Sequence, residues 1–515
     1  MTKSWRYILC LPARAHTLIK QTAFAFTLPP LLMGIWLFQH FDRVTTAFQY
    51  VERAPWIPSY NITYFMGIDG ISISMVLLTA LLCPICILAS WGIDKGIKGY
   101  FALFLLLDTG MMGVFVALDF FLFYIFWEVM LLPMYFLIGI WGGPRREYAA
   151  IKFFLYTLAG SVLMLLAMLV LYFASEPHTF DMTQLMAQSG TYSTAPVVWG
   201  LSLQHLLWLA LFIGFAIKIP AFPFHTWLPD AHVEAPTAIS VILAGILLKM
   251  GTYGILRINY GILPAATMDL AFWFLAALGT WNIIYGALCA MAQKDLKKRV
   301  AYSTSSHMGY VMLGMAAFTP QGINGAVLQM FNHGTVTAML FLLVGVIYDR
   351  AHHREIDGFG GLAGIMPVYT GITALAFFAA MGLPGLSAFI SEVLVLIGAW
   401  QKYPGLTVFA ASAVVLTAGY MLWTMQRVYL GAPNEKYLGL AEINARELAT
   451  LLPLGAIVIW LANALRLFLL IVIGIELLET IRSYLDDHVV HVEIVLEVAL
   501  IAIARKVIVL DLKDY

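Results

Sequence analysis

Long apolar runs separated by short polar breaks fill most of the sequence. About 20 apolar residues in a helix cross the hydrocarbon core of a bilayer, and thirteen runs approach or exceed that length. They lie at 22–40, 70–93, 99–117, 120–141, 151–174, 205–227, 237–258, 268–292, 300–318, 324–348, 368–400, 406–430 and 447–465. We therefore expect an all-α fold, a polytopic membrane helix bundle of about 13–14 transmembrane helices.

The polar breaks alternate in charge. Lysine and arginine gather in every second break, at Lys95 and Lys98, Arg145 to Lys152, Lys294 to Arg299, Arg350 and Arg354, and Arg427 to Arg446. The other breaks are nearly free of them, with Arg43, Arg53 and Lys402 as exceptions, and the 175–204 loop has none. Basic loops stay in the cytoplasm, so the same alternation predicts a cytoplasmic amino terminus.

Two of the predicted helices carry residues that interrupt a helix. The run FAIKIPAFPFHTWLPDAH places Lys218 two residues before Pro220, and MGLPGLSAFISE places Gly382 and Pro384 shortly before Glu392. Proline removes a backbone donor and clashes with the preceding turn. Two broken helices in matching positions, each with an ionisable residue, indicate a transporter built from inverted repeats, although the residues at the two breaks differ.

Composition excludes several other classes of protein. Of the 515 residues 61% are hydrophobic and 11% are charged, against about 25% charged in soluble domains. The formal net charge is zero, and the basic residues lie in loops without interleaved aromatics, which argues against a nucleic-acid partner. The pair Cys83 and Cys86 has no second pair or histidine at zinc spacing, so we expect these cysteines to pack and no metal to bind.

Ionisable residues inside the apolar runs are the candidates for chemistry. A charge at the bilayer centre costs about 2.5–3.5 kcal/mol on insertion scales. Each such residue is therefore expected to have a charged or polar partner or to serve the function of the protein. Six candidates form an acid–base series spread over several helices: Glu128, Lys218, Lys249, His307, His333 and Glu392. Lysine gives up its proton readily when desolvated, and histidine titrates near neutral pH.

Each candidate also has a purely structural interpretation. A single histidine in a membrane is often a hydrogen-bonded structural group, and Glu128 with Lys218 could form a static buried ion pair, which stabilises little after desolvation. Lys249 has no acidic residue nearby in sequence, so a static pair is less plausible there. Asp69, Asp108 and Asp119 lie near the ends of spans, where we expect solvent to reach them.

Five segments of the chain resemble a known family. They are GIDGISISMVLLTALL, FLFYIFWEVMLLPMYFLIGIWG, AIKIPAFPFHTWLPDAHVEAPTAISVILAGILLKMGTYGILR, QKDLKKRVAYSTSSHMGYVMLG and GLPGLSAFISEVLVLIGAW. Over about residues 22–460 the sequence is similar to chain M (chain 4) of respiratory complex I, the proton-translocating NADH:quinone oxidoreductase. The resemblance implies an antiporter-like subunit of fourteen helices that translocates protons.

The resemblance also implies roles for the six residues. Glu128 and Lys218 would be an ion pair, Lys249 the central lysine, His307 and His333 the linking path, and Glu392 the carboxylate on the exit side. Glutamate at this last position resembles chain M, because the sister chain L usually has lysine there.

The resemblance further implies the surroundings of the chain. The partners would be other membrane-arm subunits, especially two sister antiporter-like subunits on either side, in the cytoplasmic (inner) membrane of a bacterium. NADH, FMN, iron–sulfur clusters and quinone are expected in partner subunits. We expect no cofactor in this chain, which has no Gly-rich dinucleotide fingerprint and no cysteine cluster.

The ends depart from the family pattern. The family's first helix should precede the 22–40 span, yet residues 1–21 are basic and too short to cross a membrane. The tail beyond about residue 461 faintly resembles the phosphate-starvation-inducible E membrane family. We therefore divide the chain into a cytoplasmic basic segment (1–21), a first span with an external loop (22–68), an antiporter-like bundle (69–435), a last family-like helix (436–465) and divergent membrane-associated helices (466–515).

Two other functions fit the same pattern of residues. The first is a subunit of a multisubunit cation/proton antiporter or of a membrane-bound hydrogenase, which co-purification with an NADH dehydrogenase would exclude. The second is a membrane scaffold that transports nothing, which loss of proton pumping on changing Lys249 would exclude.

Overall fold

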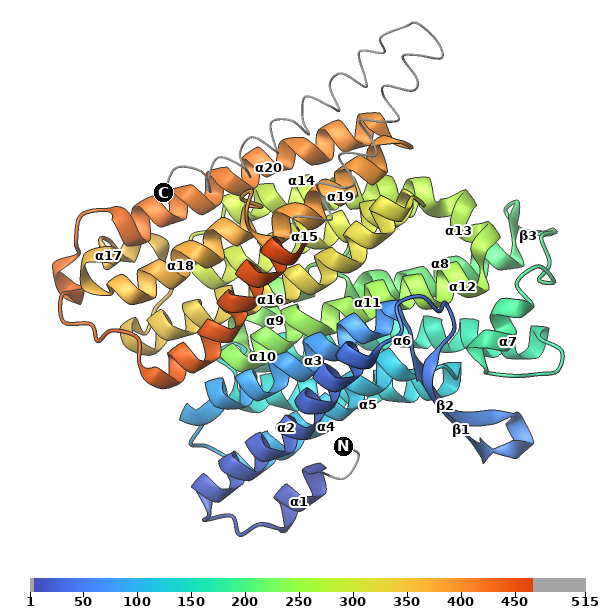
Figure 1. Ribbon diagram of the computed structural model, residues 1–515, viewed down its shortest axis with the longest axis horizontal. Helices are drawn as coiled ribbons and strands as arrows, with labels where there is room; N and C mark the ends of the chain where they lie inside the picture. Colours follow the sequence, from blue (N-terminus) through green and yellow to red (C-terminus); the bar gives the residue numbers. More distant parts are fainter. Residues whose placement is uncertain (1–3, 466–515) are drawn as a thin grey trace, which may run out of the picture.

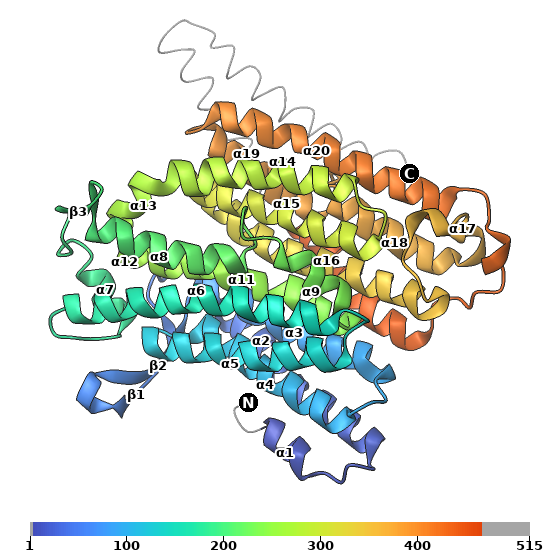
Figure 2. The same cartoon turned by 180° about the vertical axis from the view of Figure 1, so that it is seen from behind.

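Helices that run side by side from one end of the bundle to the other dominate the protein (Figures 1 and 2). The structure is a computed structural model that describes residues 4–465. Among these residues ten helices are long and apolar enough to cross a membrane: α2 His16–His40, Gly70–Gly92 (α3 Gly70–Ala89 and its last turn), α4 Ile97–Val116, α5 Phe120–Trp141, α6 Arg146–Ala174, Thr237–Ile262, Pro264–Met291, α16 Pro320–Ala351, Pro404–Leu430 and Ala445–Leu465.

Three of these long helices contain wide π turns. Thr237–Ile262 consists of α10 Thr237–Ile242, α11 Leu248–Gly254 and α12 Tyr260–Ile262, joined by π turns at Leu243–Leu247 and Ile255–Asn259. Pro264–Met291 joins α13 Pro264–Ala271 to α14 Leu278–Met291 in the same way, and α20 Pro404–Thr424 ends in a π turn at Met425–Leu430. Such turns often occur at functional sites.

The remaining predicted spans also form helices. One is α15 Leu296–Ala316, a 21-residue helix that is more polar than the others. The other two are the interrupted spans, α8 Leu203–Lys218 followed by the short helix α9 Trp227–Glu234, and α18 Pro367–Ala380 followed by α19 Ser387–Trp400. Each of the thirteen predicted spans therefore contains helix, and ten of them hold the helices that are long and apolar enough to cross a membrane. The predicted helices after residue 465 lie outside the described residues.

The first long helix begins earlier than predicted. The segment 1–21 was expected to precede the first helix, but α2 begins at His16 and a short helix, α1 Ser4–Cys10, comes before it. In the sequence, Lys20 lies just before the start of the apolar run at 22–40. In the structure its ammonium donates to the carbonyl of Trp91 at 2.7 Å and lies 3.8 Å from Asp94, so the charge is satisfied at the end of the bundle.

Two small hairpins were not foreseen. β1 Gln49–Ile57 pairs antiparallel with β2 Ile62–Ile68 through a tight turn in which Asn61 has a φ of 51°. β3 Pro196–Val198 pairs with β4 Leu201–Ser202. Short alternating segments such as ITYFMGI are strand signals, and a search for long apolar runs does not detect them.

The connecting segments gather at two opposite ends of the bundle. At one, the basic end, Arg354 bonds Asp295 at 3.2 Å and Arg350 bonds Glu447 at 2.8 Å. At the other, the hairpin end, β1, β2, β3 and the short helix α7 Met182–Ala187 project from the bundle (Figure 1). The predicted alternation of basic and non-basic loops therefore matches the two ends.

Candidate functional site

The first broken helix ends at its lysine. α8 stops at Lys218 rather than continuing to 227 as predicted, and residues 219–226 are not helical. A side chain of α14 satisfies the freed backbone, since Asn282 accepts from the amide of Phe222 at 3.0 Å and donates to the carbonyl of Ser305 at 2.9 Å. Irregular backbone is tolerated at membrane depth only when protein or water supplies such partners.

The second break positions Glu392. Residues 381–386 separate α18 from α19, and Gly382 there has a φ of 68°. A Cβ atom at 382 would lie 2.5 Å from Oε2 of Glu392, so only glycine leaves room for the carboxylate. Asn332 of α16 donates to the carbonyl of Ser387 at 2.8 Å. Each break is thus secured by an asparagine from a neighbouring helix.

Lys249 lies in the middle of Thr237–Ile262 with none of its surface exposed. Its ammonium donates to the carbonyl of Ala244, within the first π turn, at 2.6 Å and contacts Nδ1 of His333 at 2.6 Å. A charged lysine can only donate, so Nδ1 must accept. When Lys249 is charged, His333 is therefore a neutral imidazole with its proton on Nε2.

The series continues from His333 to a carboxylate. The rings of His333 and His307 lie 5.7 Å apart between centroids, and Nδ1 of His307 lies 3.1 Å from Oε1 of Glu392. Gln329 also donates to Oε1 of Glu392, at 3.4 Å. The structure therefore brings four of the six predicted residues into one row, in the order Lys249, His333, His307, Glu392.

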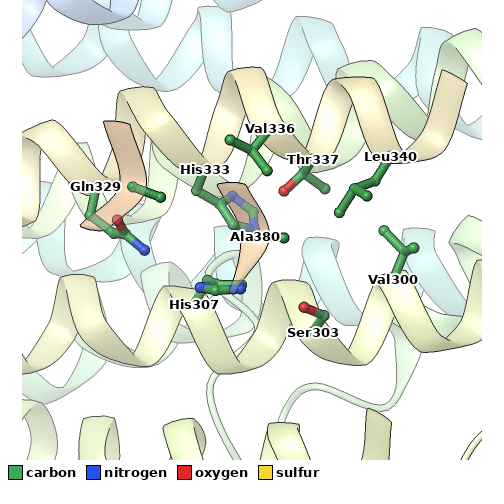
Figure 3. A pocket seen from close by; sticks show the side chains of 10 residues that line it. Val300, Ser303, His307, Gln329, His333, Val336, Thr337, Leu340 and Ala380 are labelled. Atoms are coloured by element: carbon green, nitrogen blue, oxygen red, sulfur yellow. The ribbon is translucent and has the colours of Figure 1, made fainter. Parts of the chain in front are cut away.

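A small cavity lies between the two histidines, about large enough for a single water molecule (Figure 3). Its walls come from α15, α16 and the ends of α18 and α19, and the lining residues are Val300, Ser303, His307, Gln329, His333, Val336, Thr337, Leu340, Ala380 and Ala388. Nε2 of His307 and Nε2 of His333 are both buried and have no hydrogen-bond partner in residues 4–465. Buried polar atoms are almost always satisfied, so these nitrogens fit a water between the rings.

The implied ion pair of Glu128 and Lys218 is not in direct contact. Within residues 4–465 the ammonium of Lys218 has Met130 Sδ as its hydrogen-bond partner, at 3.4 Å, and lies 5.3 Å above the ring of Trp127. In the same range Oε1 of Glu128 is buried without a partner.

Sequence reasoning missed two buried basic residues near this row. His232 on α9 is fully buried, stacks on Phe341 with a centroid distance of 4.5 Å, and has no partner for either ring nitrogen in the described part of the chain. Lys297 is 4% exposed and donates to the carbonyl of Ala235 at 2.6 Å. Lys297 stood in a cluster of loop charges, and only the fold shows that α9 covers it. His232 could have been found in the sequence, because it stands in the segment WLPDAH directly after the first broken helix.

Two of the aspartates expected to reach solvent are buried. Asp108 is 3% exposed and accepts from the thiol of Cys83 at 3.1 Å, and Asp119 is fully buried beside Thr63. That expectation was wrong because α3 and the β2 hairpin strand cover these positions.

Asp69 fixes the hairpin end of the Lys249 helix. It caps α3 and bonds Arg257 at 2.7 Å. Burial acts to raise the pKa of Asp69, but the hydrogen bonds and charge of Arg257 outweigh it and hold this pKa below its usual value. Asp69 therefore stays ionised, and it ties the helix of Lys249 to α3.

Three protein families match the chain. The family described as NADH-ubiquinone oxidoreductase chain 4, amino terminus, matches residues 17–118, and the NADH:quinone oxidoreductase/Mrp antiporter transmembrane family matches 117–417. The phosphate-starvation-inducible E family matches 451–515. The row from Lys249 to Glu392 lies entirely within the second match.

Relatives and solved structures agree with these matches. NADH-quinone oxidoreductase subunit M of Rhodobacter capsulatus is 45% identical over 449 residues, 86% of each chain. A chain of respiratory complex I from Thermus thermophilus superposes with a TM-score of 0.79 at 29% identity, covering 88% of this chain and 92% of that one. A chain of the Mrp complex from Dietzia shares the fold, with a TM-score of 0.77 at 22% identity and coverage of 90% and 93%. This multi-pass membrane chain therefore belongs to the family of NADH-quinone oxidoreductase subunit M, also called chain 4.

Proposed function

We propose that this chain is the membrane-arm subunit of an NADH:quinone oxidoreductase that carries protons along the row Lys249, His333, His307 and Glu392. One observation carries the proposal most directly. Four ionisable groups on four different helices succeed one another in the middle of an apolar bundle, with polar contacts of 2.6 Å and 3.1 Å at the two ends of the row. Intramembrane ionisable residues are retained where they serve a path for ions or protons.

Each group of the row takes part in one proton transfer. Lys249, when charged, donates to Nδ1 of His333, and a neutral imidazole that gains a proton on one nitrogen can release one from the other. The water-sized space between the rings lets that proton reach His307, whose Nδ1 faces Glu392. Each transfer thus runs between groups in contact or bridged by one water.

Lys218 and Glu128 act as the control of this row. Their charges are separated in this structure: Lys218 is buried, Glu128 is partly buried with its Oε1 atom unpartnered, and in residues 4–465 neither side chain has an opposite charge in contact. Drawing Lys218 towards Glu128 would remove its positive charge from the neighbourhood of Lys249 and favour a proton on Lys249. Separating the pair would favour release. Moving one charge against 100 mV requires about 2.3 kcal/mol, which rearranging buried charges in a low dielectric can supply.

The setting of the chain follows from the same proposal. The basic end, with the amino terminus, faces the cytoplasm, and the hairpin end faces outward. Sister antiporter-like subunits adjoin the bundle on either side, and NADH, FMN, iron–sulfur clusters and quinone bind to other subunits. That this chain binds no cofactor itself stays a prediction.

A pull-down separates this proposal from its rivals. An affinity tag on this chain, in detergent-solubilised membranes, should bring down an assembly that oxidises NADH with a quinone acceptor. An assembly that exchanges cations for protons without NADH oxidation would contradict the proposal in favour of an antiporter. Loss of proton pumping in an assembled Lys249→Ala complex would exclude the scaffold.

A further inference from the structure

The cavity between the histidines extends towards the basic end. α15 enters the bundle from that end, and Val300 and Ser303 precede His307 by two turns and one turn on the same side of the helix. On α16 the residues Thr337 and Leu340 follow His333 in the same direction (Figure 3). Seven residues of helix rise about 10 Å. The cavity, which Gln329 also lines, therefore reaches past the two histidines towards the basic end, as far as Val300 and Leu340.

The part of the cavity next to the histidines is lined with hydroxyl groups. Ser303 accepts a hydrogen bond from Tyr420 at 2.8 Å, which leaves its own proton free to donate into the cavity. Thr337 is buried, and its hydroxyl makes no hydrogen bond with another residue in the range 4–465. Two hydroxyls and two unpartnered ring nitrogens provide the two to four polar contacts that a buried water needs.

Two apolar side chains line the cavity at the end that is nearer to the basic end of the bundle. Val300 and Leu340, 4% and 3% exposed, face each other across the cavity's far end (Figure 3). One turn beyond Val300 on the same helix lies Lys297, whose buried ammonium is held by the carbonyl of Ala235. Polar groups thus lie on both sides of one valine and one leucine.

We propose that Val300 and Leu340 form a closed gate between the basic end and the histidine cavity, and that opening this gate admits water and protons to His307 and His333. The inference rests on the proposed function, because a proton inlet at the histidines has meaning only if the row carries protons. A hydrophobic constriction closes a path by excluding water. While the gate is closed, as in this structure, His307 and His333 cannot exchange protons with the basic end. They can then exchange protons only within the row that begins at Lys249.

The test opens the gate with the smallest possible change. Val300→Thr keeps the shape of the side chain and adds a hydroxyl to the apolar layer. In proteoliposomes of the whole complex, a protonophore should speed up wild-type NADH oxidation several-fold, and we expect this stimulation to fall at least twofold in Val300→Thr. The control is Val311→Thr, a fully buried valine of α15 outside the cavity, which should keep wild-type stimulation.

A second pair of variants tests the other side of the gate, so that the result does not depend on a change at Val300 alone. Leu340→Ser should lose stimulation in the same way, and Leu343→Ser, another buried leucine of α16 outside the cavity lining, should keep it. Wild-type stimulation in assembled complexes of both Val300→Thr and Leu340→Ser would overturn the gate; if Leu340→Ser does not assemble, Val300→Thr decides. Lys249→Arg, measured alongside, separates the two claims. If it still pumps normally, the proposed function fails, and if it stops pumping while the gate variants behave as wild type, only the gate fails.

Discussion

The ammonium of Lys249 and Nδ1 of His333 lie 2.6 Å apart, between two helices whose residues are 84 positions apart in the sequence. No acidic side chain in residues 4–465 forms an ion pair with this lysine. A lysine whose side-chain partners are a neutral imidazole and a carbonyl can lose its proton without leaving a buried carboxylate unpaired. This contact fits the proposed relay, and the predictions below test its consequences.

Replacing the histidine of this contact should stop the relay. His333→Gln keeps an oxygen that can accept from Lys249 but cannot take up and release a proton. We expect an assembled complex whose proton-coupled quinone reductase activity falls at least about tenfold, which corresponds to about 1.4 kcal/mol. His40→Gln, at an exposed histidine at the end of α2, is the control. Coupled activity within twofold of wild type in His333→Gln would show that protons pass elsewhere.

Glu128→Gln tests whether Glu128 and Lys218 control proton transfer along the row. The amide keeps the shape of the side chain but cannot attract the ammonium of Lys218. We expect normal assembly with strongly lowered coupled quinone reductase activity, measured with a matched Glu147→Gln variant at an exposed glutamate in the first turn of α6. Normal pumping by an assembled Glu128→Gln complex would count decisively against the switch.

The glycine beside Glu392 allows a controlled test of the second break. Gly382 and Gly385 both have positive φ, but a Cβ at 385 meets no atom within 4 Å, whereas one at 382 meets the Glu392 carboxylate. Alanine at either position should cost about 1–3 kcal/mol of backbone strain. We expect Gly382→Ala, but not Gly385→Ala, to reduce proton pumping beyond its effect on thermal stability. Equal loss of pumping in the two variants would mean that Glu392 does not depend on this contact.

The orientation of the bundle can be tested with reporters. A reporter inserted in the exposed part of the 175–204 loop should be active only outside, and one inserted at 294 only in the cytoplasm. α7 and β3 of the 175–204 loop lie at the hairpin end (Figure 1), and Lys294 lies at the basic end, where its carbonyl accepts from the amide of Ile356 at 2.9 Å. The reverse pattern of activity would overturn the argument from the basic loops.

Much of this fold was readable from the sequence because membrane helices leave a strong signal. All of the predicted spans up to residue 465 form helices, and the breaks next to Lys218 and Glu392 were visible as proline and glycine in apolar runs. The two hairpins were missed because short strands lack a long-range pattern. The start of α2 was misplaced because sequence alone does not show that Lys20 reaches the carbonyl of Trp91.

The site was only partly readable for a different reason. Sequence reveals which ionisable residues lie inside apolar runs, so all four members of the row were identified as candidates. It does not reveal which residues contact which, and so the separation of Glu128 from Lys218 was not foreseen. It also does not show that α9 folds over Lys297 and buries His232, because that burial depends on packing between distant helices.

The most direct measurement of the central claim is the number of protons pumped per electron by a Lys249→Arg complex. Arginine keeps the positive charge and approximate volume of lysine but does not lose its proton at any accessible pH. Lys402→Arg, at an exposed lysine of the hairpin end, is the matched control and should pump at the wild-type ratio. We predict that Lys249→Arg assembles and oxidises NADH but pumps fewer protons per electron, because transfer through this chain is abolished. An assembled Lys249→Arg complex with the wild-type ratio would show that the lysine is a fixed charge and that the row does not carry protons.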